Sequence, residues 1–481
     1  MSIQSVGQLV LDLGVKLPVV VEVSNASLSS DAGLLAVRQF DEQLRFTELF
    51  SAALGEPRVG DVEHPRLSMV RQRMYGILAG YEDQNDHDAL RSDPVFKLIA
   101  NRLPTDPDLA SQPTLSRFEN SVTIPDLWKL RDVLADQFLD AFPEPPLRIT
   151  LDADAVDDPT HGRQQLTLFH GFYEQYQYLP VVITCAETDQ VALVGLRHGT
   201  AHPALGVDDD LRYLVGRIRE RWPDVEIHVR GDCGCGLPSM YDVCEELRIT
   251  YTFGLSMNPR LKAACDELQT QALTDYAESG GKPQRQFLDL WYRADSWPRE
   301  RFVVIKVEAH EQGTNQRAVV TNRLGAPQCP AAVYDSYTER GESENRNKEL
   351  KVGLHADRLS DHRFMANFFR LYLHAAALNL LVRLRRHIRT TFTPAELGVL
   401  DEGPAATLPE PERRKYFNRR READPLGEGH ACTWRVRLFK VAAEVFVTAR
   451  RVVVRVSAHW PYLTHLIDVA RQTGAVVVPS G

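Results

Sequence analysis

The stretch RITLDADAV at residues 148–156 fixes the fold class of the chain. Apolar and polar residues alternate along it, which predicts a β-strand with Asp152 and Asp154 on the same face. The proline-rich run AFPEPPLR at 141–148 ends the helical pattern that precedes this strand. We therefore expect an α/β domain to begin here.

Segments on the C-terminal side of this strand alternate between the two periodicities. Strand-like patterns follow at 178–187, 190–199, 226–232 and 249–255. Amphipathic helical patterns lie between them at 209–222 and 237–248. Three strands, a helix, a strand, a helix and a strand predict a mixed sheet with helices packed on it.

Four regions follow from these patterns. We expect a helical N-terminal region over 1–142, an α/β core formed by 147–257 and 331–392, a β-rich insertion over 258–330 and a basic C-terminal helical region over 393–481. The insertion is predicted from three consecutive strand-like segments between 287 and 323, which favour antiparallel pairing.

Composition places the chain among folded globular proteins. Of its 481 residues, 43% are hydrophobic and 25% are charged. The longest apolar run, at 371–382, is too short to cross a bilayer. The seven cysteines are scattered and odd in number, and the first basic residue is Lys16, so we expect a cytoplasmic chain without a secretory signal or membrane span.

Charge is spread unevenly along the chain. The net charge is −9, yet residues 341–481 hold 23 Lys and Arg against 15 Asp and Glu. The basic clusters lie near 383–389, 413–421 and 450–455. Such clusters can neutralise the phosphates of a nucleic acid, or they can form an ordinary solvated face.

Acidic residues occur where predicted strands end. Asp154 lies near the end of the first strand, and Asp232 ends the fourth strand in HVRGDCGCG. Ligands of α/β sheets gather at strand ends, and a divalent cation with oxygen ligands relieves the repulsion between two carboxylates. Mg²⁺ is the natural candidate, while the alternative is that these aspartates only form turns.

The segment YTERGESENRNKELK at 337–351 predicts a helix with one chemically rich face. At about 100° per residue, Tyr337, Arg340, Glu344 and Lys351 fall within a stripe about 60° wide, and Lys348 lies beside it. The segment has almost no apolar residues, so we expect no ordinary core face. A simple surface pair between Glu344 and Lys348 is the alternative interpretation.

Together these elements predict a phosphoryl-transfer site. Carboxylates of Asp154, Asp232 and Glu344 can hold two divalent ions in the arrangement used for in-line displacement at phosphorus. Arg340 and the two lysines, Lys348 and Lys351, would contact the negatively charged backbone of the substrate.

The chain resembles the DDE transposases of bacterial insertion sequences. The strand order with its acids is similar to their ribonuclease-H-like core, and Tyr337, Arg340, Glu344 and Lys351 match the Y-(2)-R-(3)-E-(6)-K pattern. The stretches at 151–171 and 229–236 resemble those of the DDE group-1 subfamily.

The resemblance implies cut-and-paste DNA transposition by two-metal phosphoryl transfer. The metal ligands would be Asp154, Asp232 and Glu344, and the cofactor would be two Mg²⁺ or Mn²⁺ ions. Terminal inverted repeats and target DNA would be the double-stranded partners, with the region 1–142 binding the DNA ends. Because two ends must be joined, we expect a homodimer on DNA.

Relatives carry a hydroxyl residue two positions after the first catalytic Asp, whereas Val156 stands in that place here. This departure leaves Asp152 as the alternative to Asp154, although Asp154 lies nearer the strand end. Two other functions stay open: a nuclease with the same core but no strand transfer, and a non-catalytic DNA-binding derivative of a transposase.

Overall fold

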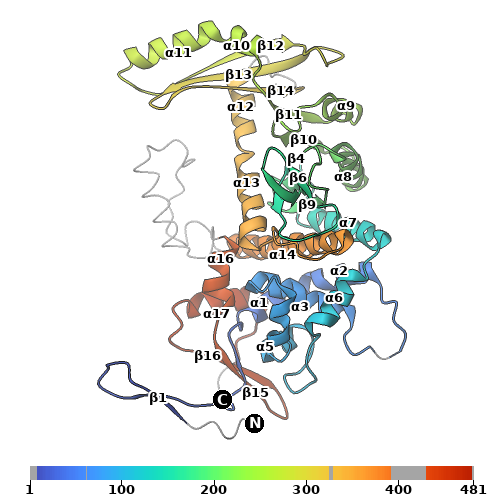
Figure 1. Ribbon diagram of the computed structural model, residues 1–481, viewed down its shortest axis with the longest axis vertical. Helices are drawn as coiled ribbons and strands as arrows, with labels where there is room; N and C mark the ends of the chain where they lie inside the picture. The colour runs from blue at the N-terminus through green and yellow to red at the C-terminus, as the bar shows by residue number, and fades with distance from the viewer. Residues whose placement is uncertain (1–7, 61, 324–328, 392–429, 479–481) are drawn as a thin grey trace.

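The computed structural model describes residues 8–60, 62–323, 329–391 and 430–478. Its centre is an eight-stranded mixed sheet in the order β12-β13-β14-β11-β10-β4-β8-β9 (Figure 1). Five of these strands form the core: β4 (Arg148–Ala155), β8 (Val181–Cys185), β9 (Val191–Gly195), β10 (Glu226–Gly231) and β11 (Thr250–Leu255). The mixed α/β sheet expected from the sequence is confirmed.

Strand β4 organises this sheet. It pairs in parallel with β10, which places Arg230 beside Asp152, and antiparallel with β8, which places Val182 beside Asp154. Its apolar side chains, such as Leu151, are buried under α8 (Val207–Arg221) and α9 (Pro238–Glu246). The aspartates therefore project from the other side of the sheet.

The insertion extends the same sheet instead of forming a separate one. Strand β11 pairs antiparallel with β14, which continues the sheet toward β13 and β12. The elements are α10 (Pro259–Ala264), α11 (Asp266–Glu278), β12 (Gln284–Tyr292), β13 (Arg301–His310) and β14 (Gly313–Thr321). Figure 1 shows this part at one end of the molecule, with α11 lying along the strands.

A helical rod runs beside the sheet on the side opposite α8 and α9 (Figure 1). It consists of α12 (Pro330–Thr338), α13 (Gly341–Lys348) and the π-helical turn η4 (Glu349–Gly353). A tightened turn at 339–340 joins the two helices, where the amide of Ser343 donates to the carbonyl of Arg340 at 2.9 Å. The rod leads to the long helix α14 (Phe364–Thr391).

Helix α14 is the central helix of the molecule. Its segment Phe364–Ile388 is apolar and long enough to cross a membrane, but 89% of the most apolar window is buried inside the protein. It packs against α3, α7 and β9, so its apolar character belongs to a core.

The N-terminal region is mainly helical, and most of its helices lie below α14 (Figure 1). These helices are α1 (Leu34–Leu44), α2 (Phe46–Leu54), α3 (Arg66–Ala79), α4 (His87–Leu90), α5 (Pro94–Ile99), α6 (Gln112–Asn120) and α7 (Ile124–Leu139), with the 3-10 turn η2 (Gln84–Asp86). Three short strands precede them: β1 (Leu9–Leu11), β2 (Val19–Val21) and β3 (Leu28–Ser29).

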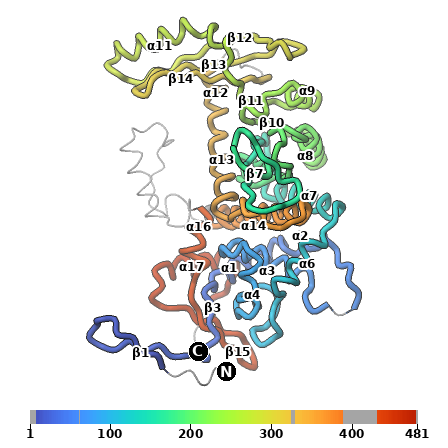
Figure 2. The backbone as a smooth tube through the Cα atoms, viewed as in Figure 1, coloured from blue at the N-terminus to red at the C-terminus, as the bar shows by residue number. Residues whose placement is uncertain are grey.

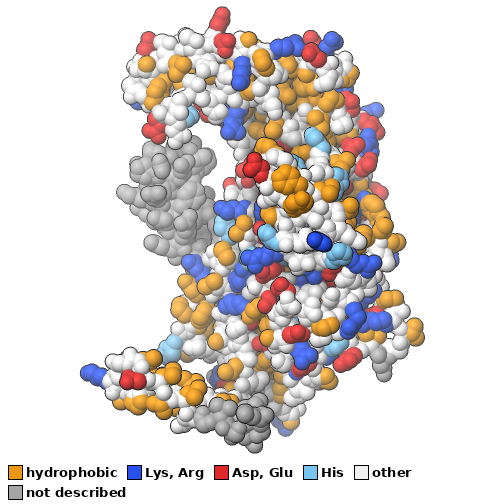
Figure 3. All heavy atoms as spheres, viewed as in Figure 1, with side chains coloured by type: hydrophobic (Ala, Val, Ile, Leu, Met, Phe, Trp, Pro, Cys, Tyr) orange, Lys and Arg blue, Asp and Glu red, His pale blue; other side chains and the backbone are white. Residues whose placement is uncertain are grey.

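A small sheet lies directly after β4 in the chain. Its strands are β5 (Asp158–Pro159), β6 (Leu168–His170) and β7 (Gln175–Tyr178), in the order β5-β7-β6. Figure 3 shows hydrophobic side chains gathered in the middle of the visible face, where Figures 1 and 2 place this small sheet.

The prediction that the C-terminal region is helical is wrong for its middle part. Helical turns occupy α16 (Ala431–Trp434), η6 (Arg435–Phe439) and α17 (Leu463–Gln472), but β15 (Ala443–Val447) and β16 (Val452–Val456) form a hairpin. The β-branched valines on both sides of the turn favour extended backbone. Strand β15 also pairs with β3 from the opposite end of the chain (Figure 2). The basic cluster at 413–421 lies outside the described residues.

Candidate active site

Asp154 is held at the end of β4 in a partly buried position. Its Oδ2 atom accepts a hydrogen bond of 2.9 Å from Nδ2 of Asn347 and lies 3.8 Å from Nη1 of Arg340. Burial raises the pKa of this carboxyl to about 6; the charges of Asp232 and Glu344 add to the effect, while Arg340 and Asn347 oppose it. Asp232 and Glu344 therefore both lie within electrostatic range of Asp154.

Asp232 follows β10, in the turn that leads to α9. Its Oδ1 accepts the backbone N–H of Gly234 at 2.9 Å, which orients the carboxylate locally. The neighbouring strand β11 carries Gly254, where an added Cβ would lie 2.9 Å from the hydroxyl of Tyr337. The missing side chain at Gly254 lets the phenol of Tyr337 approach the Asp232 turn.

Helix α13 supplies the third acid. Glu344 is exposed and accepts a hydrogen bond of 2.6 Å from Nη2 of Arg340, one helical turn earlier. The face of the helix that is turned toward the sheet is buried through Ser343 and Asn347, so this buried face is made of small polar side chains. The expectation of no ordinary core face holds, because none of the buried side chains of α13 is apolar.

The two lysines predicted to bind DNA differ in their surroundings. Lys348 is exposed at the end of α13. Lys351 lies in the turn η4 and its Nζ is 2.7 Å from Oδ1 of Asp157, which follows β4. Lys348 is the last residue of the helix that carries Glu344, and Lys351 follows in η4.

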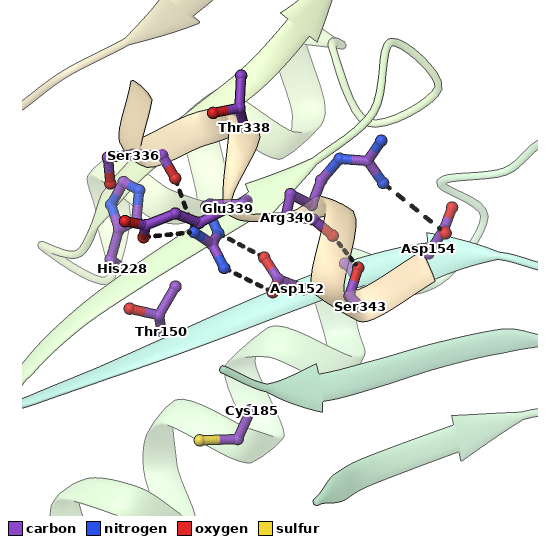
Figure 4. A network of polar contacts seen from close by, with 12 residues as sticks. Thr150, Asp152, Asp154, Cys185, His228, Ser336, Thr338, Glu339, Arg340 and Ser343 are labelled. Carbon is purple, nitrogen blue, oxygen red and sulfur yellow. Dashed lines mark hydrogen bonds and ion pairs between the residues drawn. The ribbon is translucent and has the colours of Figure 1, made fainter. Parts of the chain in front are cut away.

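Asp152 makes a different kind of interaction, although it points from the same strand face (Figure 4). Both of its oxygens accept from Arg230, at 2.6 Å from Nε and 2.8 Å from Nη2, and both side chains are 2% exposed. Arg230 also donates to the carbonyl of Ser336 at 2.7 Å, which ties the sheet to α12. The oxygens of Asp152 are therefore occupied by an internal ion pair.

The side chains of this site have the chemistry of Mg²⁺ ligands, but they are not grouped as closely as the ligands of a bound metal ion. Asp154, Asp232 and Glu344 offer the carboxylate oxygens that Mg²⁺ prefers, and their mutual repulsion favours a cation between them. In the described ranges, no three His, Cys, Asp or Glu side chains are grouped closely enough to hold a metal ion. Glu344 is turned toward Arg340, whose charge partly compensates the acids.

Two side chains of this site were missed in the sequence. Asn347 lies three residues after Glu344 and bonds to Asp154, and Asp157 pairs with Lys351. Their positions in YTERGESENRNKELK and DADAVDD are adjacent to predicted site residues, which is the only signal that the sequence offers.

Comparison with known proteins identifies the family of the chain. No curated protein matches the chain in a sequence comparison. The family model described as "Transposase DDE domain group 1" matches residues 12–399, which is most of the chain. Proteins of this family act on DNA and generally use divalent metal ions. The chain therefore belongs to the group 1 transposases with a DDE domain, which are DNA transposases.

Proposed function

We propose that this chain catalyses cut-and-paste transposition of an insertion sequence by two-metal phosphoryl transfer at terminal inverted repeats. Asp154, Asp232 and Glu344 are the proposed metal ligands. The observation that carries the proposal is that one guanidinium, that of Arg340, contacts both Asp154 on β4 and Glu344 on α13, and that Asp232 after β10 lies near enough to raise the pKa of Asp154.

Asp154 is preferred over Asp152 because of what each carboxylate already contacts. Asp152 is enclosed with Arg230, and a metal ligand there would have to break a buried ion pair. Asp154 keeps an exposed fraction of 18% and contacts a neutral amide and a more distant guanidinium. The departure at Val156 therefore does not move the proposed metal ligand to Asp152.

These carboxylates would hold Mg²⁺ or Mn²⁺, with Glu344 contacting the ion in place of Arg340. When bound, a pair of such ions activates a hydroxyl for attack and stabilises the leaving oxygen. The chain itself positions the ligands: Asn347 fixes Asp154 by a hydrogen bond, and the bidentate pair between Asp152 and Arg230 locks β4 against β10.

The basic residues on the rod are proposed to hold the DNA backbone. Arg340 can engage a phosphate bidentately, and Lys348 and Lys351 add charge along the same segment. The phenol of Tyr337 lies against the turn that carries Asp232, where it can support the bound strand. We also propose that the region 1–142 recognises the DNA ends and that the protein acts as a homodimer.

Cleavage of DNA that carries the element's ends tests the site. We expect Asp154→Asn, Asp232→Asn and Glu344→Gln to abolish strand cleavage in Mg²⁺ or Mn²⁺ while binding of the DNA persists. The matched control is Asp335→Asn, because this exposed acid of α12 pairs with Arg285 away from the three acids. Cleavage at the normal rate by the Glu344→Gln protein would refute the ligand assignment.

A second assay separates transposition from simple hydrolysis. With a supercoiled target plasmid added, a transposase produces joined strands, whereas a nuclease produces only cut ones. A third measurement is metal binding by the protein and by the variant that combines Asp154→Asn, Asp232→Asn and Glu344→Gln. Metal binding that is lost in this variant would exclude the alternative that the chain is a non-catalytic DNA-binding derivative.

A further inference from the structure

The hairpin formed by β6 and β7 presents aromatic side chains to solvent. Phe169 stands opposite Tyr176 in the pairing, and Phe172 lies at the tip. Their exposed fractions are 51%, 59% and 83% respectively. Adjacent exposed aromatic side chains of this kind mark an interaction surface more often than scattered ones do.

The hairpin holds these rings in fixed orientations. Phe169 and Tyr176 meet edge to face with centroids 5.5 Å apart, and Phe172 and Tyr173 do so at 5.0 Å. At the tip, the carbonyl of His170 accepts the amide of Glu174 at 2.8 Å. A surface that is already ordered loses little conformational entropy when a ligand binds.

The hairpin is anchored beside the candidate active site. Gln175 donates to Asp157 at 3.2 Å, and the same aspartate pairs with Lys351. On its other side the hairpin packs against Gly199, where an added Cβ would lie 2.1 Å from the carbonyl oxygen of Gln177. The aromatic surface is therefore fixed relative to the end of β4.

One ring of the hairpin lies within the electrostatic field of the acids. Burial raises the pKa of Tyr173, and the charges of Asp157, Asp154 and Asp232 raise it further. The hairpin therefore lies beside the acids at which the proposed function places the cleaved phosphate.

We propose that the hairpin at 168–176 stacks on unpaired bases of the DNA strand next to the phosphate that is cleaved. This inference rests on the proposed function and deepens it, because it makes a locally unpaired strand the substrate. Bases inside a duplex have both faces covered by their neighbours, whereas an unpaired base offers a free π-face to Phe172 or Tyr176. Every base has such a face, so the contact tolerates any sequence.

Equilibrium binding of the full chain to two DNAs tests this proposal. The probes are a fully paired duplex and the same duplex with a bubble of unpaired bases that contains 2-aminopurine, both in EDTA so that no cleavage occurs. We expect the protein to prefer the bubble and to change the fluorescence of 2-aminopurine. Phe172→Ala and Tyr176→Ala should each weaken binding of the bubble by about 5- to 150-fold and leave binding of the duplex unchanged.

Variants at Phe172 distinguish stacking from general apolar contact. Phe172→Trp should retain the preference for the bubble, and Phe172→Leu should lose it. The matched control is Trp291→Ala, which removes an aromatic side chain that is 64% exposed on β12 and should change neither affinity.

Four results would overturn the proposal. An undiminished preference of the Phe172→Leu protein for the bubble would show that aromatic stacking is not the interaction. A change in sedimentation of Phe172→Ala would show that the hairpin contacts a second copy of the chain. If Phe172→Ala and Tyr176→Ala both keep the preference for the bubble and bind the duplex normally, the hairpin does not stack on bases, and the proposed function still stands. If the unsubstituted protein binds neither DNA, both the stacking proposal and the proposed function are refuted.

Discussion

Two aspartates that lie two residues apart on β4 should respond in opposite directions to the same substitution. We expect Asp154→Asn to raise the free energy of unfolding at pH 8 and Asp152→Asn to lower it. The reason is that Asp154 is an acid beside other acids, whereas Asp152 neutralises a buried guanidinium.

The magnitude for Asp154 follows from its pKa, which rises from 3.8 to about 6 on folding. Above pH 6 the carboxylate is ionised in both states, and the folded state bears a cost of about 3 kcal/mol for that charge. As pH falls through 6 the folded protein binds the proton first, so the cost shrinks and disappears below about 4. Asp154→Asn removes it and should stabilise the protein by up to about 3 kcal/mol at pH 8.

Burial raises the pKa of Asp152 as well, although Arg230 opposes the rise. The opposite sign follows from the partner that the substitution leaves behind: Arg230 is 2% exposed, so Asp152→Asn leaves a buried cation without its counter-charge. Breaking a buried pair in this way costs about 3–5 kcal/mol.

Urea denaturation in EDTA, followed by circular dichroism at pH 8 and pH 4, measures both effects. The stabilisation by Asp154→Asn should be present at pH 8 and absent at pH 4. Equal losses of stability from both substitutions would refute the distinction between the two acids, as would a gain for Asp154→Asn that persists at pH 4.

Further predictions concern the glycines and the cations. Gly199→Ala should lower the melting temperature because its Cβ would overlap backbone oxygens, whereas Gly216→Ala on α8 meets no atom within 4 Å and should stabilise by about 0.5–1 kcal/mol; equal melting temperatures would contradict this. Lys351→Ala should reduce the slope of log affinity for DNA against log salt by about 1, and an unchanged slope would remove it from the phosphate contacts. Arg340→Gln should raise the pKa of Asp154 further in metal-free protein, since the guanidinium lowers it; an NMR titration that shows a lower pKa would contradict this.

Local periodicity was enough to predict the sheet and its insertion, but not the C-terminal strands. The alternation in RITLDADAV gives a strand, and its burial pattern agrees with that. The segment 433–456 mixes helical turns with two strands, and β15 completes its small sheet with β3 from more than four hundred residues earlier. A partner so distant leaves no signal in a local window, although the valine-rich runs on both sides of the turn at 448–451 were available.

The sequence predicted which face of a strand or helix each site residue occupies, but not which side chains contact one another. Strand alternation placed Asp152 and Asp154 on one face, and helical spacing placed Arg340 and Glu344 one turn apart. What separates the two aspartates is the register of β4 against β10, which sets Arg230 directly beside Asp152. Cross-strand register depends on the packing of the whole sheet, so neither residue reveals its partner in the sequence.

The two acids of β4 have different roles: Asp152 stabilises the fold, and Asp154 is the proposed metal ligand. Asp152 and Arg230 satisfy each other inside the sheet and tie it to α12, which gives the site a fixed frame. Asp154 gains no comparable partner; it is held among like charges by a neutral amide and by a guanidinium that is shared with Glu344. A carboxylate kept in such a costly position is what a site needs when a cation is to bind there, because the repulsion among the acids is relieved only when the cation arrives.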